Sequence, residues 1–468
     1  MKKPSIVCII PPYYRLIESK NNRVSPAMHY AAQTLAQNGF PVTLINGDYA
    51  DQNTSYCDRY SMYCNNWLFE ERYREGFKAF DETVQKALKY NPSIVIIGAG
   101  DVLLPTVEMG NGQSCAAIAA GIKRQDRSIK CIGYGHMLKY TAPRYLQELD
   151  VIITSECEDI LVDVITNKTE GLIHDHWVSN LDCLPILTTD YIAQEINKYD
   201  FDYIMSMRGC QYKCRFCLQP GMRKQIGRLS VEHFRNDLLY RIHHLGLTTF
   251  YFSDMVFLSK KDPRKKEMLS MLCEIKKAFP SFRWCCEERT DSMSEEDYLL
   301  WKMAGCFHIK YGVEALDQKI LNALGKHTKF EHAQQAFARS KKAGLQTTAY
   351  ILLGCPGFTD KDYREMLQLF HELDADNYVV NISVPYCGTQ LNQQLQHQLK
   401  EGSPYYNSEE GFFHLSDQMS QLWGISPETL RRYFDLRTKK EDRSYRQYTR
   451  KIVDPQIYFS EHRIEYME

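Results

Sequence analysis

The chain has 468 residues, which is too long for one compact core and predicts two or three domains. Its 57 lysines and arginines nearly balance 58 aspartates and glutamates, so no global basic field argues for a nucleic-acid partner. Apolar runs are far shorter than a membrane span, and the first residues lead into a strand rather than a signal-peptide core. We therefore expect a cytoplasmic protein without a membrane partner, whose 16 cysteines are free or metal-bound thiols.

Short apolar strands alternate with amphipathic helices over residues 1–165. A helix is expected to begin at Pro26, which suits a first helical turn, and to end at Asn38. This order predicts a doubly wound parallel sheet whose ligands lie at the carboxyl ends of the strands. The predicted strands are residues 5–10, 42–45, 94–97, 130–133 and 151–154.

Glycine, proline or polar residues follow four of these strands. Glycine lets a ligand approach the backbone closely, but no GxGxxG opens the first helix, so a dinucleotide site is poorly supported. The four strand-end loops are residues 11–14, 98–101, 133–136 and 155–158.

An insertion at residues 48–90 is rich in aromatic side chains, and its second half is predicted to be a helix with Phe69, Tyr73, Phe77 and Phe80 on one face. We interpret this segment as a helix packed on the sheet; a cap over a cofactor or substrate is the alternative.

A linker is predicted at residues 166–200, after which the alternation of strands and helices resumes. Six such units over residues 201–392 predict a partial (β/α)6 barrel open on one side, followed by a mainly helical segment at 393–468. The predicted barrel strands are residues 201–207, 249–252, 283–287, 308–313, 347–353 and 378–384.

Cys210, Cys214 and Cys217 form a CxxxCxxC spacing in the loop after the first barrel strand. Three thiolates can hold three irons of a [4Fe–4S] cluster and leave the fourth iron open to another ligand. A zinc site is the weaker interpretation, because no second cysteine or histidine pair follows nearby. Three inert buried thiols are the remaining alternative. The loop lies where α/β barrels carry their chemistry.

With Phe216 directly before the third cysteine, this motif resembles that of the radical S-adenosylmethionine (SAM) superfamily, whose open iron binds the amino and carboxylate groups of SAM. Asp254 occupies the place of the family's Gly-Gly-Glu turn, which binds the ammonium group in the methionine part of SAM. Arg289 resembles the residue that makes the family's next contact with SAM. Its guanidinium either binds a carboxylate through two hydrogen bonds or pairs with Asp291. The resemblance implies SAM-binding roles for Phe216, Asp254, Arg289, Glu314, Leu353 and Gly354.

The first domain resembles the cobalamin-binding domain that precedes the radical SAM core in one large subgroup. Residues 133–136 are similar to its Gly-Gly-x-His turn, and residues 385–389 match the Pro-Tyr-x-Gly-Thr that closes its barrel. The DxHxxG motif is absent, so we expect cobalamin to bind without a protein histidine on cobalt; a domain kept only as a scaffold is the alternative. The implied cobalamin contacts are Pro12, Tyr13, Gly98, Gly100, Gly133, Gly135, His136 and Glu156.

The resemblance implies an enzyme that cleaves SAM to a 5′-deoxyadenosyl radical and methylates an unactivated carbon of a small-molecule or peptide-derived metabolite. It also implies an external electron donor such as flavodoxin or ferredoxin. No catalytic residue is assigned; Cys355 and Cys387 are either buried structural thiols or hydrogen donors at the barrel mouth.

Two other functions stay open. One is a cobalamin-free radical SAM dehydratase, epimerase or cyclase, and the other is a non-catalytic iron–sulfur or cobalamin sensor. Because a sensor needs only the cysteines, the presence of every SAM-contacting turn argues against it. An RNA methylthiotransferase is disfavoured by the neutral charge and by the lack of a cysteine triplet in the first domain.

Overall fold

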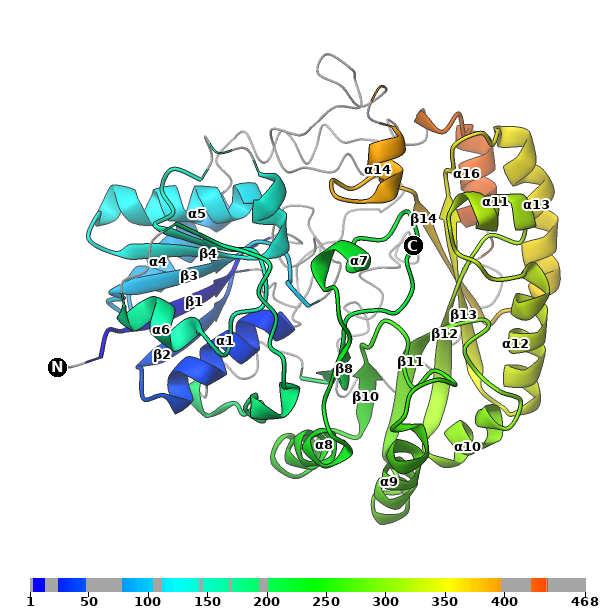
Figure 1. Ribbon diagram of the computed structural model, residues 1–468, viewed down its shortest axis with the longest axis horizontal. Coiled ribbons are helices and arrows are strands. Elements are labelled where there is room, and N and C mark those ends of the chain that lie inside the picture. The colour runs from blue at the N-terminus through cyan, green and yellow to red at the C-terminus, as the bar shows by residue number, and fades with distance from the viewer. Residues whose placement is uncertain are drawn as a thin grey trace.

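The structure, a computed structural model, has two α/β bodies that lie side by side, the first at the left of Figure 1 and the barrel at the right. The predicted aromatic insertion and the segment 393–468 fall largely outside the residues that the structure describes. The described residues are 3–12, 24–47, 78–103, 112–141, 143, 146–167, 171–192, 201–395, 397, 422–434 and 436.

The first body is a six-stranded sheet in the order β2-β1-β3-β4-β5-β6. Every neighbouring pair is parallel, which confirms the predicted doubly wound sheet. Its strands are β1 (Ile6–Ile10), β2 (Val42–Asn46), β3 (Ile94–Gly98), β4 (Lys130–Tyr134), β5 (Val151–Ile153) and β6 (Gly171–Ile173).

Helices cover both faces of this sheet, because β1 and its neighbours are apolar on both sides. Ile6 and Cys8 belong to the core that contains the residues of α1, whereas Val7 and Ile9 belong to the core with α4 and α5. Helix α1 begins after Ser25, whose hydroxyl accepts the backbone N–H of Met28. The helices of this body are α1 (Pro26–Gln37), α4 (Lys78–Leu88), α5 (Gly112–Gln125), α6 (Leu161–Thr166) and the 3-10 turn η2 (His136–Tyr140).

Strand β6 lies inside the range 166–200 that the sequence assigns to a linker, so the sheet continues to Ile173 rather than ending near 165. This edge strand has three residues, of which the first two are exposed, and it therefore carries no apolar run that a pattern could detect. The rest of that range contains two 3-10 turns, η4 (Leu181–Cys183) and η5 (Asp190–Ile192).

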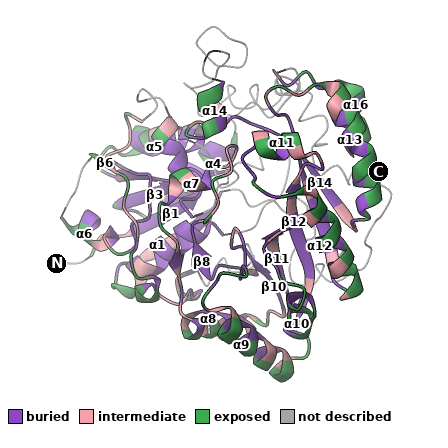
Figure 2. Cartoon of the chain, turned by 45° about the vertical axis from the view of Figure 1, so that its right-hand side comes forward, coloured by how far each residue is buried: buried purple, intermediate pink, exposed green. Residues whose placement is uncertain are grey.

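The second body is the predicted partial barrel, six parallel strands in the order β14-β13-β12-β11-β10-β7. Alternate residues such as Trp284 and Ile309 point outward into the core beneath the surrounding helices. In Figure 2 these strands are mostly purple, whereas the outer helices show exposed green faces. The strands are β7 (Tyr203–Ile204), β10 (Thr249–Phe252), β11 (Arg283–Arg289), β12 (Cys306–Glu314), β13 (Gln346–Leu353) and β14 (Asn377–Ile382).

A small antiparallel strand pair and several described helices surround the barrel strands. A two-stranded antiparallel pair, β8 (Met207–Arg208) with β9 (Gly227–Arg228), was not predicted, because two-residue strands give no periodic signal. The helices are α7 (Gln219–Met222), α8 (Val231–Leu245), α9 (Lys265–Ala278), α10 (Asp297–Met303), α11 (Gln318–Ala323), α12 (Phe330–Lys342), α13 (Asp360–Leu373), α14 (Gln390–Gln394) and α16 (Pro427–Phe434).

The described part of the C-terminal segment packs on the barrel. Trp423 and Tyr433 are buried, and Tyr433 donates its hydroxyl to the carbonyl of Tyr363 on α13 at 2.7 Å. Among the helices that the structure describes, none has the length and apolar character needed to cross a bilayer.

Candidate active site

The three cysteines of the CxxxCxxC motif lie in one loop whose base is closed by the β8–β9 pair. We call residues 209–218 the cluster loop. Gly209 begins it with a φ of +88°, a backbone conformation that favours glycine. Cys210, Cys214 and Cys217 are each half-buried, and the thiols of all three interact electrostatically with one another. The structure thus places the three thiols that the sequence singled out in one loop.

Two nearby cations oppose the effect of burial on the pKa of these thiols. Burial raises the pKa of all three thiols, to about 12 for Cys217. The positive charges of Lys326 and Arg289 act in the opposite direction on the pKa of Cys210 and Cys214. Because bound iron deprotonates a coordinating thiol, partly buried thiols beside two cations fit an iron–sulfur cluster.

Within the described ranges, no three His, Cys, Asp or Glu side chains converge as around a single ion. A [4Fe–4S] cluster does not require such convergence, because each iron takes one thiolate and the three sulfurs stand at separate corners. The donor set therefore fits a cluster better than a mononuclear ion.

Asp254, which follows β10, uses its carboxylate to hold the chain that leads into the cluster loop. Its Oδ1 accepts the backbone N–H groups of Ser206 and Met207 at 2.9 and 2.8 Å, and its Oδ2 accepts the Ser206 hydroxyl at 2.6 Å. Burial raises the pKa of this carboxyl to about 6, although these hydrogen bonds act to lower it. Asp254 thus positions residues 206–207, while its backbone stands at the predicted SAM turn.

Arg289, the last residue of β11, joins its own turn to the cluster loop. Its Nε and Nη2 donate to the two carboxylate oxygens of Asp291 at 2.9 and 3.2 Å, so the predicted alternative of a pair with Asp291 is present. Its Nη1 lies 3.9 Å from Cys214 Sγ, and its guanidinium carbon lies 3.9 Å from the ring centroid of Tyr212. The arginine therefore links the turn at Asp291 to the cysteine loop.

Glu314 ends β12 in a left-handed conformation, with a φ of +63° that is unusual for a residue with a side chain. Its Oε1 accepts a 2.8 Å hydrogen bond from Lys326 Nζ. Lys326 was not singled out from the sequence. Gly325, which directly precedes it after the short helix α11, is the local sequence signal for this turn.

The remaining predicted SAM residues contact the barrel in different ways. Phe216 is half-buried against the main barrel core. Leu353 has its side chain in that outer core, so only its backbone can face the lumen. Gly354 has a φ of +104°, and a Cβ there would lie 2.3 Å from the Trp423 ring. Glycine at 354 is thus required by the tryptophan that packs over it.

Polar side chains that the sequence did not single out also line the inside of the barrel. Tyr251 and Tyr350 both donate their hydroxyls to Glu287 Oε1, the latter at 3.3 Å. Lys310 Nζ lies 4.1 Å from the ring centroid of Tyr251. Alternation along β10 to β13 places these residues on the face opposite the apolar core.

His136, at the end of β4, carries a nitrogen lone pair without a partner among the described residues. Its Nδ1 lies 2.6 Å from the carbonyl oxygen of Asp101, so Nδ1 holds the proton and Nε2 is the acceptor. Nε2 is buried and has no hydrogen-bond partner in the described part of the chain. Burial lowers the pKa of His136 to about 4, which keeps the ring neutral. A buried acceptor at this edge of the sheet fits a ligand with amide N–H groups.

The glycines predicted to contact cobalamin make room for protein atoms. A Cβ at Gly100 would lie 2.9 Å from the His136 ring, and one at Gly135 would lie 2.0 Å from the carbonyl oxygen of Ala99. A Cβ at Gly133 would lie 2.8 Å from Leu138. These glycines keep the strand-end turns closely packed.

Of the other predicted contacts in the first domain, Gly98 is the last residue of β3 and Pro12 is buried after β1. Tyr13 lies outside the described residues. Both described residues thus sit at the carboxyl edge of the sheet, the edge where a doubly wound fold holds its ligand.

Glu156, predicted as a cobalamin contact, lies in a buried ion cluster with the chain on both sides of the cluster loop. Arg208 donates from Nη1 to Glu156 at 3.0 Å and from Nη2 to Glu158 at 2.8 Å. Arg223 pairs with the other oxygen of Glu156 and donates from Nη2 to the carbonyl of Val178 at 2.9 Å. The turn after β5 is thus tied to β8 and to the end of α7.

A second contact joins the two bodies at the turn after β14. A Cβ at Gly388 would lie 2.1 Å from the hydroxyl of Tyr140, so the end of η2 rests directly on the Pro-Tyr-Cys-Gly-Thr turn. Cys387 in this turn is half-buried, and Cys355 after β13 is buried.

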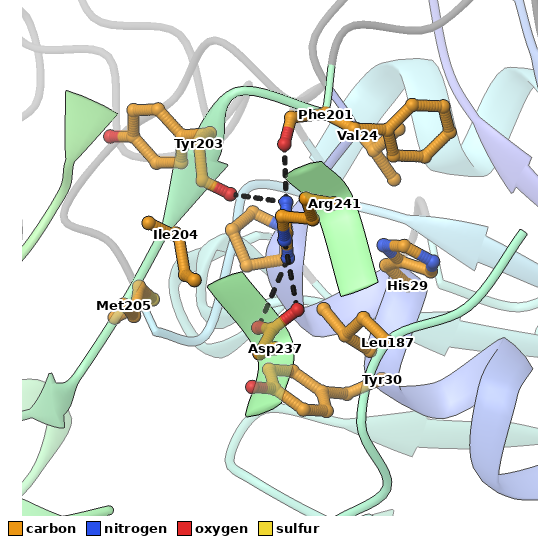
Figure 3. Close-up of a pocket in the computed structure, with 11 residues that line it drawn as sticks. Val24, His29, Tyr30, Leu187, Phe201, Tyr203, Ile204, Met205, Asp237 and Arg241 are labelled. Atoms are coloured by element: carbon orange, nitrogen blue, oxygen red, sulfur yellow. Dashed lines mark hydrogen bonds and ion pairs between the residues drawn. The ribbon is translucent and has the colours of Figure 1, made fainter. Parts of the chain in front are cut away.

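A cavity of about 20 Å³ lies where α1 meets β7 and α8 (Figure 3), with room for about one water. Arg241 donates from Nη1 to the carbonyl of Tyr203 at 3.0 Å and from Nε to Asp237 at 2.9 Å. His29 faces this cavity, with Nε2 3.1 Å from the carbonyl oxygen of Thr188. The cavity belongs to the packing between the bodies and is too small for SAM.

Comparisons with known proteins agree with this arrangement. An uncharacterized methyltransferase of Pyrococcus horikoshii is 25% identical over 340 residues, which cover 67% of this chain and 71% of that protein. The solved structure of the radical SAM methyltransferase TsrM from Kitasatospora setae, with cobalamin and a [4Fe–4S] cluster bound, superposes with a TM-score of 0.65 at 14% identity, covering 86% of this chain and 77% of the other.

The cobalamin-dependent SAM radical enzyme OxsB, with aqua-cobalamin and SAM bound, superposes with a TM-score of 0.62 at 15% identity, covering 98% of this chain and 72% of the other. At these identities the two structures establish the shared two-domain fold. Residues 204–370 match the model of the Radical SAM superfamily. The barrel therefore carries a radical SAM domain, the kind of domain whose enzymes use a [4Fe–4S] cluster and SAM.

Proposed function

We propose that this enzyme is a cobalamin-dependent methyltransferase that methylates an unactivated carbon of a small-molecule or peptide-derived substrate. The observation that carries the proposal is the docking of the first sheet's carboxyl edge on the cluster end of the barrel. Glu156 after β5 pairs with Arg208, two residues before Cys210, and Tyr140 after β4 touches Gly388. A cofactor at that edge would face the cysteine loop.

The proposed cluster ligands are Cys210, Cys214 and Cys217. When bound, the cluster and SAM supply a 5′-deoxyadenosyl radical, and cobalamin supplies a methyl carrier. The chain's own contribution is orientation. Asp254 fixes the entry to the cluster loop, and Arg289, paired with Asp291, reaches Cys214 from the end of β11.

The cobalamin part of the proposal is supported by His136. Its Nε2 is a buried acceptor without a described partner, and the amide side chains of a corrin ring are matching donors. The neutral ring, held through Nδ1 by Asp101, keeps this acceptor in a fixed direction. An unpartnered Nε2 can accept a corrin amide N–H or coordinate a metal, and because the sequence lacks the DxHxxG motif the proposal assigns His136 to a corrin amide rather than to cobalt.

The test is an incubation with a candidate substrate, a reductant, hydroxocobalamin and SAM that is deuterated in its methyl group. Two SAM molecules are consumed per methylation, because one SAM cannot supply both the methyl group and the radical. S-adenosylhomocysteine and 5′-deoxyadenosine should therefore appear in about equal amounts, and deuterium should reach the product. Formation of 5′-deoxyadenosine without S-adenosylhomocysteine, with an unlabelled product, would replace the proposal by a radical dehydration, epimerisation or cyclisation.

A further inference from the structure

A buried lysine, Lys326, stands beside the cluster loop on the turn that follows α11. This turn is fixed to the loop through its backbone. The Leu324 carbonyl accepts the backbone N–H of Arg215 at 2.9 Å, and the Lys326 carbonyl accepts Nη2 of Arg289 at 2.8 Å. The position of the lysine is therefore set by the same segments that carry Cys214 and its arginine neighbour.

The ammonium group of Lys326 is held inside the protein. The residue is 5% exposed, and its Nζ pairs with Glu314 at 2.8 Å. A Cβ at Gly312 would lie 2.7 Å from Nζ, so the glycine on β12 leaves the space that the ammonium occupies. Burying a lysine costs free energy even when it is paired, and the barrel strand is shaped to accommodate it.

The lysine charge acts on all three cluster cysteines. Burial raises the pKa of Cys210, Cys214 and Cys217, and the lysine charge opposes this rise; for Cys214 it is the largest of the charge effects. The contacts agree, because the turn that carries Lys326 binds the backbone N–H of the residue after Cys214, and the Lys326 carbonyl holds Arg289, whose Nη1 lies 3.9 Å from Cys214 Sγ. Glu314 acts on Cys214 in the opposite direction and more weakly. Of the two charged groups in the Lys326–Glu314 pair, the ammonium therefore has the larger electrostatic effect on the Cys214 thiol.

We propose that Lys326 sets the reduction potential of the [4Fe–4S] cluster by placing a buried positive charge beside its three thiolates, with Glu314 as the opposing charge. The inference rests on the proposed assignment of the three cysteines as cluster ligands. Reduction adds one negative charge to a cluster that three thiolates already make negative. A nearby cation in a poorly screened site stabilises the reduced form more than the oxidised form and raises the potential.

The experiment is a redox titration of the reconstituted full-length protein, without SAM, followed by the electron paramagnetic resonance signal of the reduced cluster. Lys326→Met removes the positive charge, and it should reduce the ratio of reduced to oxidised cluster at least tenfold at a fixed solution potential, which is about 59 mV for one electron. Glu314→Gln removes the negative charge and should increase that ratio. Lys326→Arg keeps the charge and should stay close to wild type.

The matched control is Lys319→Met on α11, which removes an exposed lysine whose charge water and salt screen, and which should leave the titration unchanged. Iron and sulfide are measured in every variant first. Opposite shifts in Lys326→Met and Glu314→Gln are specific to charge, because a general disturbance of the loop would move both in one direction.

A full cluster with an unchanged potential in Lys326→Met, or shifts of the same sign in both variants, would overturn the inference while leaving the proposed function intact. If Lys326→Met fails to retain its cluster, the Glu314→Gln titration decides, and the absence of a rise there overturns the inference. Wild-type protein that takes up no iron or sulfide would overturn the cysteine assignment and this inference together.

Discussion

Arg208 Nη1 lies 3.0 Å from Glu156 Oε2, and this contact joins the first domain to the strand that leads into the cluster loop. The same guanidinium reaches Glu158 at 2.8 Å, and the three side chains are at most 3% exposed. Arg208 also lies 4.8 Å from the ring centroid of Tyr30 on α1. Charges taken this far from water stabilise the assembly only while every partner is present.

Replacing Arg208 by methionine should therefore destabilise the contact between the domains by about 3–5 kcal/mol, because Glu156 and Glu158 would keep their buried charges without this partner. Urea denaturation should show this loss as a lower free energy for the unfolding transition in which the two bodies separate. Arg339→Met is the matched control: Arg339 and Glu295 form an exposed pair at 3.4 Å, which is worth about 0–1 kcal/mol. Equal effects of the two substitutions would contradict a structural role for the buried cluster.

The sequence identified the strands and the cysteine loop because both carry local signals. The apolar runs of β1 and β3 and the alternation along the barrel strands appear within a few residues. The ion cluster has no local signal, because Glu156 and Arg208 are 52 residues apart and meet only after both domains have folded. The sequence predicted Glu156 as a cobalamin contact, which stays a prediction; its pairing with two arginines had no local signal.

Local and non-local signals differ in the same way for the predicted SAM residues. The turns at Asp254 and Arg289 were placed correctly at strand ends, since strand ends follow from the pattern. The partners of these side chains, Ser206 for Asp254 and Cys214 for Arg289, come from other strands and loops. Lys326 was missed for this reason: a single lysine after a short helix has no periodicity, and its burial becomes visible only with β12 beside it.

Alanine at Cys210, Cys214 or Cys217 should abolish both cluster binding and SAM cleavage, because two remaining thiolates leave one more iron without a protein ligand. Iron and sulfide analysis after anaerobic reconstitution measures the first effect, and release of 5′-deoxyadenosine measures the second. Cys273→Ala, at a half-buried cysteine on α9, is the control and should retain a full cluster. An undiminished cluster content in the triple alanine variant would refute the ligand assignment.

His29 should make the junction between the domains sensitive to acid. Burial lowers the pKa of His29 from its ordinary value of 6.5 to about 3, so the folded state holds a neutral ring that the unfolded chain protonates below pH 6.5. The stability that depends on the neutral ring is present above pH 6.5 and is lost as the pH falls towards 3. Its ring packs against Tyr191 and Phe201 beside the cavity of Figure 3.

The free energy of unfolding of wild type relative to His29→Asn should therefore fall by about 1.4 kcal/mol per pH unit between pH 6.5 and 3. Denaturation series at several pH values give this difference. Tyr191→Phe changes a neighbour of the histidine whose phenol does not titrate in this range, so its difference from wild type should be constant. A pH-independent difference for His29→Asn would show that the folded protein accommodates the protonated ring.

His136 and His176 should differ in their effect on cobalamin. The Nε2 of His136 is buried without a described partner, whereas that of His176 lies 2.7 Å from Asp159 in a partly exposed pair. Loss of one hydrogen bond of about 1 kcal/mol should weaken cobalamin retention about fivefold in His136→Ala and leave it unchanged in His176→Ala. Neither variant should alter the absorption spectrum of the bound corrinoid, because we expect neither ring on cobalt. Equilibrium dialysis with hydroxocobalamin measures the retention, and a changed cobalt spectrum in His136→Ala would instead make this imidazole an axial ligand.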